Sequence, residues 1–156
     1  MPFKSISIPA VAFAAACLFS SDAIADKPNK KNLVSGKEVI SIYNGKTWIW
    51  TEGGSYWGSG GKFEAIWQDK AVSVGKWYAT NKGTLCYEAV WKSEAGDDGA
   101  ELKRCWKHVR DSDDVLWKQD MNSKEWYRAK EELTENMKSG NKIKSEVRKR
   151  RKQVGL

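Results

Sequence analysis

Histidine, cysteine and proline are scarce in this 156-residue chain, which contains one histidine, three cysteines and three prolines. The H-E-x-x-H, C-x-x-C and G-x-x-x-x-G-K-[S/T] motifs of zinc hydrolases, dithiol redox proteins and phosphate-binding loops do not occur in it. No serine stands in the G-x-S-x-G turn of α/β-hydrolases. The single histidine, His108, lies among cations in a strand-like stretch, where a structural role is more common than a catalytic one. We therefore expect no catalytic residue, no metal site and no cofactor.

The N-terminal residues have the pattern of an export signal. Lys4 provides a positive end, residues 6–19 are apolar apart from one serine, and Ala23-Ile24-Ala25 precedes a cleavage site ahead of Asp26. The apolar run is shorter than the roughly 20 residues that span a membrane, so an uncleaved anchor fits less well. A lipoprotein is the alternative that Cys17 leaves open, although apolar residues continue after it and the leucine usual three places earlier is missing. We expect a periplasmic or secreted protein.

Cleavage would leave two cysteines, Cys86 and Cys105. In an oxidising compartment an even pair is most simply one disulfide. With 18 residues between them, the closed loop would stabilise the fold by about 3 kcal/mol in the chain-entropy model. Two free thiols remain the alternative if the signal is not used.

Positive charge is concentrated at the C-terminal end of the chain. The net charge is +7 at pH 7, and residues 138–152 contain eight lysines or arginines against the single acid Glu146. Residues 26–137 contain equal numbers of basic and acidic residues. The body of the protein is therefore neutral, and the basicity belongs to a tail.

A short helix is expected over residues 35–43. Ser35 and Glu38 have the spacing of a capping box, and apolar residues follow them. The pair Asn44-Gly45 then ends the helix and turns the chain.

Short runs of β-branched and aromatic residues alternate with turn residues from Lys46 to Arg128, which predicts β-strands. Trp48 and Trp50 alternate with other residues and so project from one face of a strand. Gly75 is a candidate position for a bulge. We expect an all-β fold in which an antiparallel meander of 7–8 strands closes into a small lipocalin-like barrel or a strongly curved sheet, since curling removes exposed edges. A sandwich is the alternative fold.

The periodicity changes after Tyr127. Ala129, Leu133 and Met137 recur at four-residue spacing, which predicts a helix that ends at residues 139–141. The basic run 148–152 is expected to be solvated. The expected organisation is a signal peptide over residues 1–25, a linker over 26–34, a tryptophan-rich β domain over 35–128 and a basic helical or disordered tail over 129–156.

Nine tryptophans lie between Trp48 and Trp126, and they admit three explanations. The rings fill a core, or their exposed faces stack on sugars, or they surround the mouth of a barrel that holds a small apolar ligand. For any single ring, core packing is the simplest explanation. The pair Tyr56-Trp57 stands in the glycine-rich stretch 51–61, from which it could reach out of the core. We therefore predict Trp50, Tyr56 and Trp57 as ligand-binding residues.

Several aromatic residues are followed directly by a cation, as in Trp117-Lys118. Neighbours on a strand point to opposite faces. We therefore expect each ring to face inward and each cation to face water.

Acidic residues offer two further interpretations. Asp97-Asp98-Gly99 and the aspartates of residues 111–114 lack the glycine and distant glutamate of an EF-hand, so turn formation explains them better than calcium binding. An enzyme acting on the cell wall would need Glu52, Glu64 or Glu88 beside a second carboxylate in an open cleft.

The basic tail is the strongest indication of a partner. Its candidate polyanion-binding residues are Lys144, Arg148, Lys149, Arg150, Arg151 and Lys152. Near an anionic membrane each such cation contributes about 1 kcal/mol of attraction, which salt weakens. Expected partners are lipopolysaccharide, phospholipid head groups or acidic glycan, through peripheral contact; nucleic acid is not expected, because an exported protein seldom meets it. A solubilising tail without a dedicated partner is the alternative.

Five short motifs between Ser35 and Arg128 resemble a family of small exported bacterial domains of unknown function. They are Gly45-Lys46-Thr47-Trp48, Gly61-Lys62-Phe63-Glu64-Ala65, Gly75-Lys76-Trp77, Leu85-Cys86-Tyr87 and Cys105-Trp106. The resemblance implies export, a β-rich domain and a bridge from Cys86 to Cys105. It implies no activity and no catalytic residues.

These observations together favour a non-catalytic periplasmic protein that associates with the envelope and binds anionic glycan or lipid. A lipocalin-like carrier of a small apolar ligand is the second hypothesis. An enzyme acting on the cell wall is the third.

Overall fold

The computed structural model describes residues 27–68, 70–95, 100–130 and 132–156. The expected signal peptide, its cleavage site and Cys17 lie outside the described residues, and so do Asp97 and Asp98. No helix in the described part of the chain is long and apolar enough to cross a membrane. In chain order the elements are β1 (Asn32–Leu33), α1 (Gly36–Tyr43), β2 (Lys46–Trp50), β3 (Gly53–Trp57), η1 (Ser59–Gly61), β4 (Lys62–Trp67), β5 (Ala71–Ala79), β6 (Thr84–Ser93), β7 (Ala100–Arg110), β8 (Leu116–Asp120), β9 (Trp126–Arg128), η2 (Glu132–Asn136), β10 (Met137–Ser139) and α2 (Lys144–Val154).

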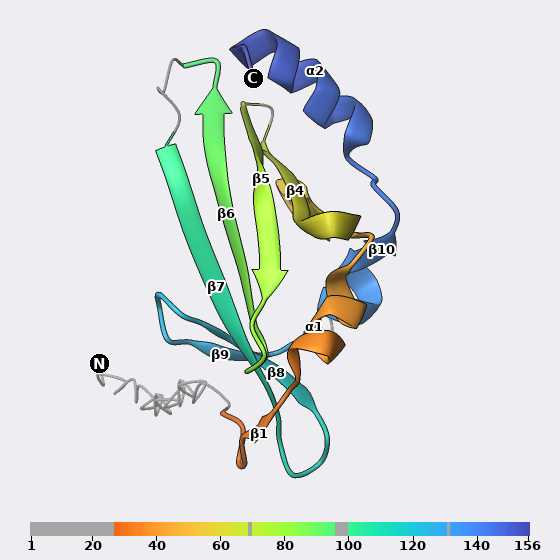
Figure 1. Ribbon diagram of the computed structural model, residues 1–156, viewed down its shortest axis with the longest axis vertical. Helices are drawn as coiled ribbons and strands as arrows, with labels where there is room; N and C mark the ends of the chain where they lie inside the picture. The colour runs from red at the N-terminus through yellow and green to blue at the C-terminus, as the bar shows by residue number, and fades with distance from the viewer. Residues whose placement is uncertain (1–26, 69, 96–99, 131) are drawn as a thin grey trace, which may run out of the picture.

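The strands form one antiparallel sheet in the order β10-β2-β3-β4-β5-β6-β7-β8-β9, and β1 pairs with β7 beside this path. The sheet curls into a half-barrel around the long strands β5, β6 and β7 (Figure 1). The predicted all-β meander with a strongly curved sheet is therefore confirmed, and the sandwich alternative is wrong. Eight strands, β2 to β9, fall in the segment expected to form the sheet. The additional strands β1 and β10 come from the expected linker and tail.

Helix α1 forms as the sequence predicts. The backbone N–H of Glu38 donates to the Ser35 hydroxyl at 3.2 Å, which caps the first turn. Val39 and Tyr43 are buried in the core, and Asn44 ends the helix ahead of Gly45, which has a φ of 73°. This helix fastens the start of the domain to the strands that follow.

The segment after β9 links the two edges of the sheet. Strands β9 and β10 are the end strands of the sheet order, yet only residues 129–136 separate them in sequence. The helix expected from Ala129 to Met137 forms only in part. The Leu133 N–H donates to the Ala129 carbonyl at 3.0 Å and η2 is π-helical, but Met137 pairs with Trp48 in the sheet. The backbone N–H and C=O groups along the edge of β2 would be unpaired without a neighbouring strand. Residues 137–139 supply that strand. The connection closes the half-barrel at one end.

Helix α2 lies across the opposite end of the sheet, on its outer face (Figure 1). Ile143 and Val147 are four residues apart and bury against Ile66 and Val72 of β4 and β5. The helix continues through the basic run 148–152, which was expected to be solvated, and ends at Gly155 in a left-handed conformation. The apolar pair at its start supplies the surface that docks the tail.

Two details of β5, β6 and β7 refine the sequence predictions. Cys86 and Cys105 are directly opposite each other and form a disulfide with an Sγ–Sγ distance of 2.11 Å, as predicted. Gly75 does not form a bulge, since β5 pairs residue by residue with both neighbours. A Cβ at Gly75 would lie 2.2 Å from the carbonyl oxygen of Glu88, so glycine permits the strands to approach.

Candidate functional site: an aromatic pocket inside the curved sheet

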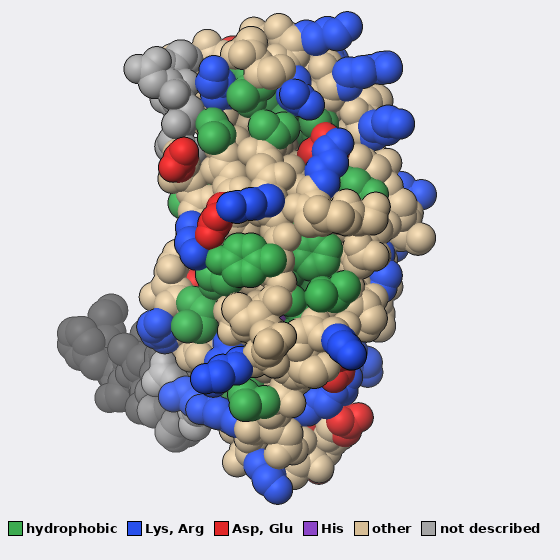
Figure 2. Space-filling model, viewed as in Figure 1, with side chains coloured by type: hydrophobic (Ala, Val, Ile, Leu, Met, Phe, Trp, Pro, Cys, Tyr) green, Lys and Arg blue, Asp and Glu red, His purple; other side chains and the backbone are tan. Residues whose placement is uncertain are grey.

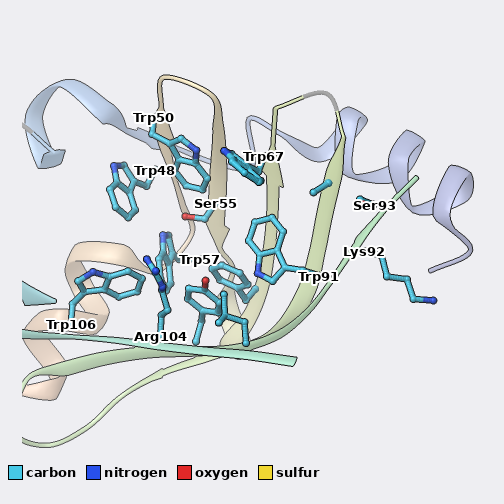
Figure 3. Close-up of a pocket in the computed structure, with 14 residues that line it drawn as sticks. Trp48, Trp50, Ser55, Trp57, Trp67, Trp91, Lys92, Ser93, Arg104 and Trp106 are labelled. Carbon is cyan, nitrogen blue, oxygen red and sulfur yellow. The ribbon is translucent and has the colours of Figure 1, made fainter. Parts of the chain in front are cut away.

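A pocket of about 580 Å³ lies on the inner side of the sheet. Eight of its lining residues are aromatic, and they converge on it from β2, β3, β4, β6 and β7 (Figure 3); they are Trp48, Trp50, Trp57, Phe63, Trp67, Tyr87, Trp91 and Trp106. This volume is typical of sites for small molecules, which are mostly apolar with a few polar groups. Six of the nine tryptophans of the chain thus surround a space instead of filling it.

A row of small side chains creates this space. Across five neighbouring strands the paired residues are, in order, Trp48, Ser55, Ala65, Ser73 and Trp91. Because paired residues on adjacent strands project from the same face, two indoles stand at the ends of the row and three small side chains at its centre. Ser55 forms part of the pocket floor, with Ala65 and Ser73 beside it in the sheet, and the indoles form the walls.

The floor and one wall contain polar atoms without partners among the described residues. The hydroxyls of Ser55 and Ser73 and the indole N–H of Trp57 are buried and make no hydrogen bond. A buried polar group left unpaired costs about 1–3 kcal/mol, so such groups are rare in folded proteins. By contrast, the Trp77 indole, which does not line the pocket, donates to the Gly58 carbonyl at 2.8 Å. Two of these unpaired groups, the Ser55 hydroxyl and the Trp57 indole N–H, therefore belong to residues that line the pocket.

The pocket opens between the two edges of the sheet. Pairing of β10 with β2 ends at Trp48, and pairing of β8 with β7 begins at Trp106. Beyond these residues the two edges diverge, and Trp50 on β2 and Arg104 on β7 line the pocket from opposite sides. Trp67, with 48% of its surface exposed, also lines it, and its indole donates to the Glu52 carboxylate at 3.2 Å.

Two cations are among the residues that line the pocket: Arg104 shares the inner face with Tyr87, whereas the Lys92 side chain points away from the indoles (Figure 3). In the part of the chain that the structure describes, neither side chain forms an ion pair or a hydrogen bond. Burial raises the pKa of the nearby Tyr87 hydroxyl, and the Trp91 indole N–H and the positive charge of Arg104 oppose this effect. The pocket is thus apolar inside and positive at its edge.

A buried ion pair lies behind the pocket wall. The Lys118 ammonium contacts both carboxylate oxygens of Glu132, at 2.6 and 2.7 Å, and the Lys118 side chain is fully buried. It also lies 4.4 Å from the ring centre of Trp48 and 5.2 Å from that of Trp106. Burial lowers the pKa of Lys118, and Glu132 opposes this.

The position of Lys118 corrects the expectation for the Trp117-Lys118 dipeptide. The cation faces the interior, and Trp117 packs on the other face with its indole N–H donating to Asp111 at 2.8 Å. The two side chains still face opposite sides of the strand, but the lysine, not the tryptophan, faces the interior, because Glu132 supplies a buried partner for its charge. The sequence contained no signal for this pair, since Glu132 lies in the connection that was expected to be helical.

His108 lies in the interior of the domain. It is fully buried, with Nε2 3.0 Å from the Tyr43 hydroxyl and Nδ1 3.1 Å from the Gly83 carbonyl. Burial, with a smaller effect of Lys118, lowers the pKa of His108 to about 3, so the ring is neutral. The Tyr43 hydroxyl also lies 3.0 Å from Glu132 and joins the histidine to the ion pair.

The three predicted ligand-binding residues are separated by the alternation of the strands. Trp50 and Trp57 line the pocket, and Trp57, at 1% exposure, lies at its base instead of reaching outward. Tyr56 points to the outer face of β3 and packs with Ile66 beneath α2. Both residues belong to strand β3, in which neighbouring side chains face opposite sides. Trp57 therefore lines the pocket and Tyr56 does not.

The predicted polyanion-binding residues lie on α2. Lys144, Arg148, Lys149 and Lys152 are exposed, and Arg151 is half-buried. Arg150 is buried and donates to the carbonyls of Trp67, Gln68 and Ala71 at the turn between β4 and β5. Five cations are thus available to solvent, and one fastens the helix to the sheet.

The acidic residues lie apart from one another. Glu52 accepts the Trp67 indole N–H, Glu64 pairs with Lys62 at 2.8 Å, and Glu88 pairs with Lys103 at 2.8 Å. The bonds from Lys103, Tyr78 and Lys76 lower the pKa of Glu88 to about 2. None of these carboxylates is paired with another one in the pocket.

Asp111 performs the turn chemistry that the sequence indicates. One of its oxygens accepts the backbone N–H groups of Asp113 and Val115, both at 2.9 Å. The bond from the Trp117 indole is the main cause that lowers the pKa of Asp111. Among the described residues no group of three or more His, Cys, Asp or Glu side chains is arranged to hold a metal ion.

Comparison with known proteins agrees with the resemblance noted in the sequence. A family model described as "Protein of unknown function (DUF995)" matches residues 6–149, which extends the likeness beyond the β domain into both flanking segments. No curated protein and no solved structure matches the chain.

Proposed function

The chain belongs to this family of unknown function, and we propose from the geometry of the pocket that it is an exported, non-catalytic binding protein for a small anionic amphiphile. The apolar part of the ligand, an acyl chain or an aromatic ring, enters the space between the indoles. Its carboxylate or phosphate lies at the edge beside Arg104. The observation that carries the proposal is the aromatic pocket of about 580 Å³ with unpaired polar atoms in its walls.

The distribution of indole exposure favours a recessed ligand over a stacked glycan. A platform for sugar stacking needs exposed ring faces, and of the described tryptophans Trp67 is the exposed one. The rings of Trp48, Trp50, Trp91 and Trp106 are half-buried or buried around the space. An apolar group placed there would remove these faces from water, which stabilises a complex by about 25 cal/mol per Å² of apolar surface buried.

The unpaired Arg104 guanidinium favours an anionic ligand. An arginine without a carboxylate partner retains its full capacity for charge-assisted hydrogen bonds, which are stronger than neutral ones. Arg104 pairs in the sheet with the pocket residue Tyr87 and so faces the same side, which places its guanidinium within reach of a group whose apolar part lies in the pocket. The Ser55 hydroxyl can bond to an additional polar atom of the ligand.

Titration with a fatty acid tests this proposal. Palmitate should quench the tryptophan fluorescence saturably, and palmityl alcohol should bind more weakly because it lacks the charge. Ser55→Leu, which fills the floor with an apolar group and removes an unpaired hydroxyl, should abolish binding and leave the protein folded. Absence of saturable binding, or unchanged binding by Ser55→Leu, would refute the proposal.

A matched pair of variants tests the role of Arg104. Arg104→Gln should weaken palmitate binding about tenfold or more, since a hydrogen bond to a charged group contributes about 1.5–3 kcal/mol. Lys103→Gln removes the same charge from the neighbouring position, which faces the other side of the strand, and should leave binding unchanged. Equal losses in the two variants would show that net charge acts, not contact with the ligand.

A further inference from the structure

We propose that the end of the molecule formed by α2 and the β4–β5 turn docks on an anionic phospholipid bilayer, with the mouth of the pocket beside the docked surface. This interaction surface is separate from the pocket and does not require a ligand in it. The proposal follows from the position of α2, the direction of its charges and the location of Trp67.

Helix α2 is held rigidly at this end of the sheet. Ile143 and Val147 are buried against Ile66 and Val72, so the outer face of the helix is fixed relative to the strands. The buried Arg150 guanidinium donates to the carbonyl oxygens of Trp67 at 3.5 Å and of Ala71 at 3.2 Å. Both of these residues line the pocket, so the helix and the pocket mouth form one unit.

The exposed face of α2 is strongly positive. Lys144, Arg148, Lys149 and Lys152 are all exposed on it, and the single acid of the helix, Glu146, lies 3.9 Å from Arg150. Lysine and arginine side chains gather over this helix in the space-filling view (Figure 2). Such a surface is complementary to the negative head groups of a bilayer.

The exposed indole at the same end favours a bilayer over a soluble polyanion. Trp67 is the last residue of β4, directly before the turn that Arg150 holds, and 48% of its surface is exposed. Indole rings are enriched at membrane interfaces, where the ring meets the head groups and its N–H remains in a polar setting. The Trp67 N–H already has such a partner in Glu52, so its apolar edge can enter the interface.

Vesicle sedimentation with the purified protein and phosphatidylglycerol-containing vesicles tests the charges. Exchange of Lys144, Arg148, Lys149 and Lys152 for glutamine should reduce partitioning about fivefold per cation removed, which corresponds to about 1 kcal/mol each. The matched control exchanges Lys30, Lys37, Lys82 and Lys130, which are also exposed but lie away from α2, for glutamine and should bind like the wild type. Binding of the wild type should disappear on vesicles of phosphatidylcholine alone and weaken with salt.

Three outcomes would overturn this proposal: equal losses in the two quadruple variants, unchanged binding by the α2 variant, or equally tight binding to a soluble acidic polysaccharide. Quenching by brominated phospholipid tests the orientation. Trp67→Phe should remove most of the quenching, whereas Trp126→Phe, on β9 far from α2 (Figure 1), should not; the reverse result would contradict the orientation. Palmitate titration in the absence of vesicles reports on the pocket alone, so failure of docking and failure of ligand binding are distinguishable.

Discussion

Removal of the buried ion pair is the most direct perturbation of this fold. In Lys118→Met a flexible apolar chain of similar length replaces the lysine, and the Glu132 carboxylate loses the donor that binds both of its oxygens, at 2.6 and 2.7 Å. The Tyr43 hydroxyl, at 3.0 Å, is its remaining side-chain donor among the described residues. The variant therefore leaves a carboxylate largely unpaired in the interior.

The magnitude follows from the burial of the pair. The Lys118 and Glu132 side chains have exposed fractions of 0% and 8%, so water cannot replace the lost partner. Breaking a buried pair by removing one member typically costs about 3–5 kcal/mol. This is a large share of the roughly 5–15 kcal/mol that stabilises an ordinary domain. Replacing both members by apolar side chains leaves no unpaired charge, so Lys118→Met with Glu132→Leu should recover most of the stability.

Guanidinium unfolding followed by tryptophan fluorescence and circular dichroism measures these differences. Lys103→Met provides the matched control, because Lys103 pairs with Glu88 at a similar distance, 2.8 Å, but its side chain is 57% exposed. Solvent screens an exposed pair, so this variant should unfold near the wild-type midpoint. A loss in Lys118→Met no greater than in Lys103→Met would refute the reasoning. A double variant as unstable as the sum of its single variants would refute it as well.

Two further predictions concern stability. Because the unfolded chain protonates its histidine near the ordinary pKa of 6.5 and the folded chain only near 3, stability should fall as pH decreases through this window, by up to about 1.4 kcal/mol per pH unit. Unfolding at pH 7, 6 and 5 should show this slope in the wild type and a flatter one in His108→Gln; equal slopes would contradict the assignment. Exchange of Cys86 and Cys105 for alanine should lower the unfolding free energy by about 3 kcal/mol and abolish any effect of a reducing agent. A variant that still responds to reductant would show that the bridge is not the source of the difference.

The sequence predicted the parts of the fold that depend on local chemistry. Ser35 and Glu38 marked the start of α1, alternation marked the strands, and the cysteine count indicated the disulfide. The elements that it did not predict depend on distant partners. Met137 joins the sheet because the edge of β2 is available to it, and Lys118 turns inward because Glu132 lies there. Neither partner is close enough in sequence for periodicity to reveal it.

The pocket was predicted only in outline. Tryptophan content alone does not distinguish a filled core from a lined space, because this depends on which residues lie between the indoles. Ser55, Ala65 and Ser73 come from three different strands, and the register of the sheet aligns them between Trp48 and Trp91. Tyr56 and Trp57 were assigned to the site together because their glycine-rich stretch could let both reach out of the core, but neighbours on a strand face opposite sides.

The buried ion pair and the pocket are linked by the two indoles that they share. Trp48 and Trp106 contact Lys118 from one side and line the pocket with the other. An apolar pair at positions 118 and 132 would stabilise the fold about as well. What the ion pair adds is a fixed geometry, because hydrogen bonds hold their two partners in one orientation. Two short hydrogen bonds to one carboxylate determine where the connection from β9 to β10 crosses the end of the sheet. The same contacts therefore fix the separation of the two edges between which the pocket opens.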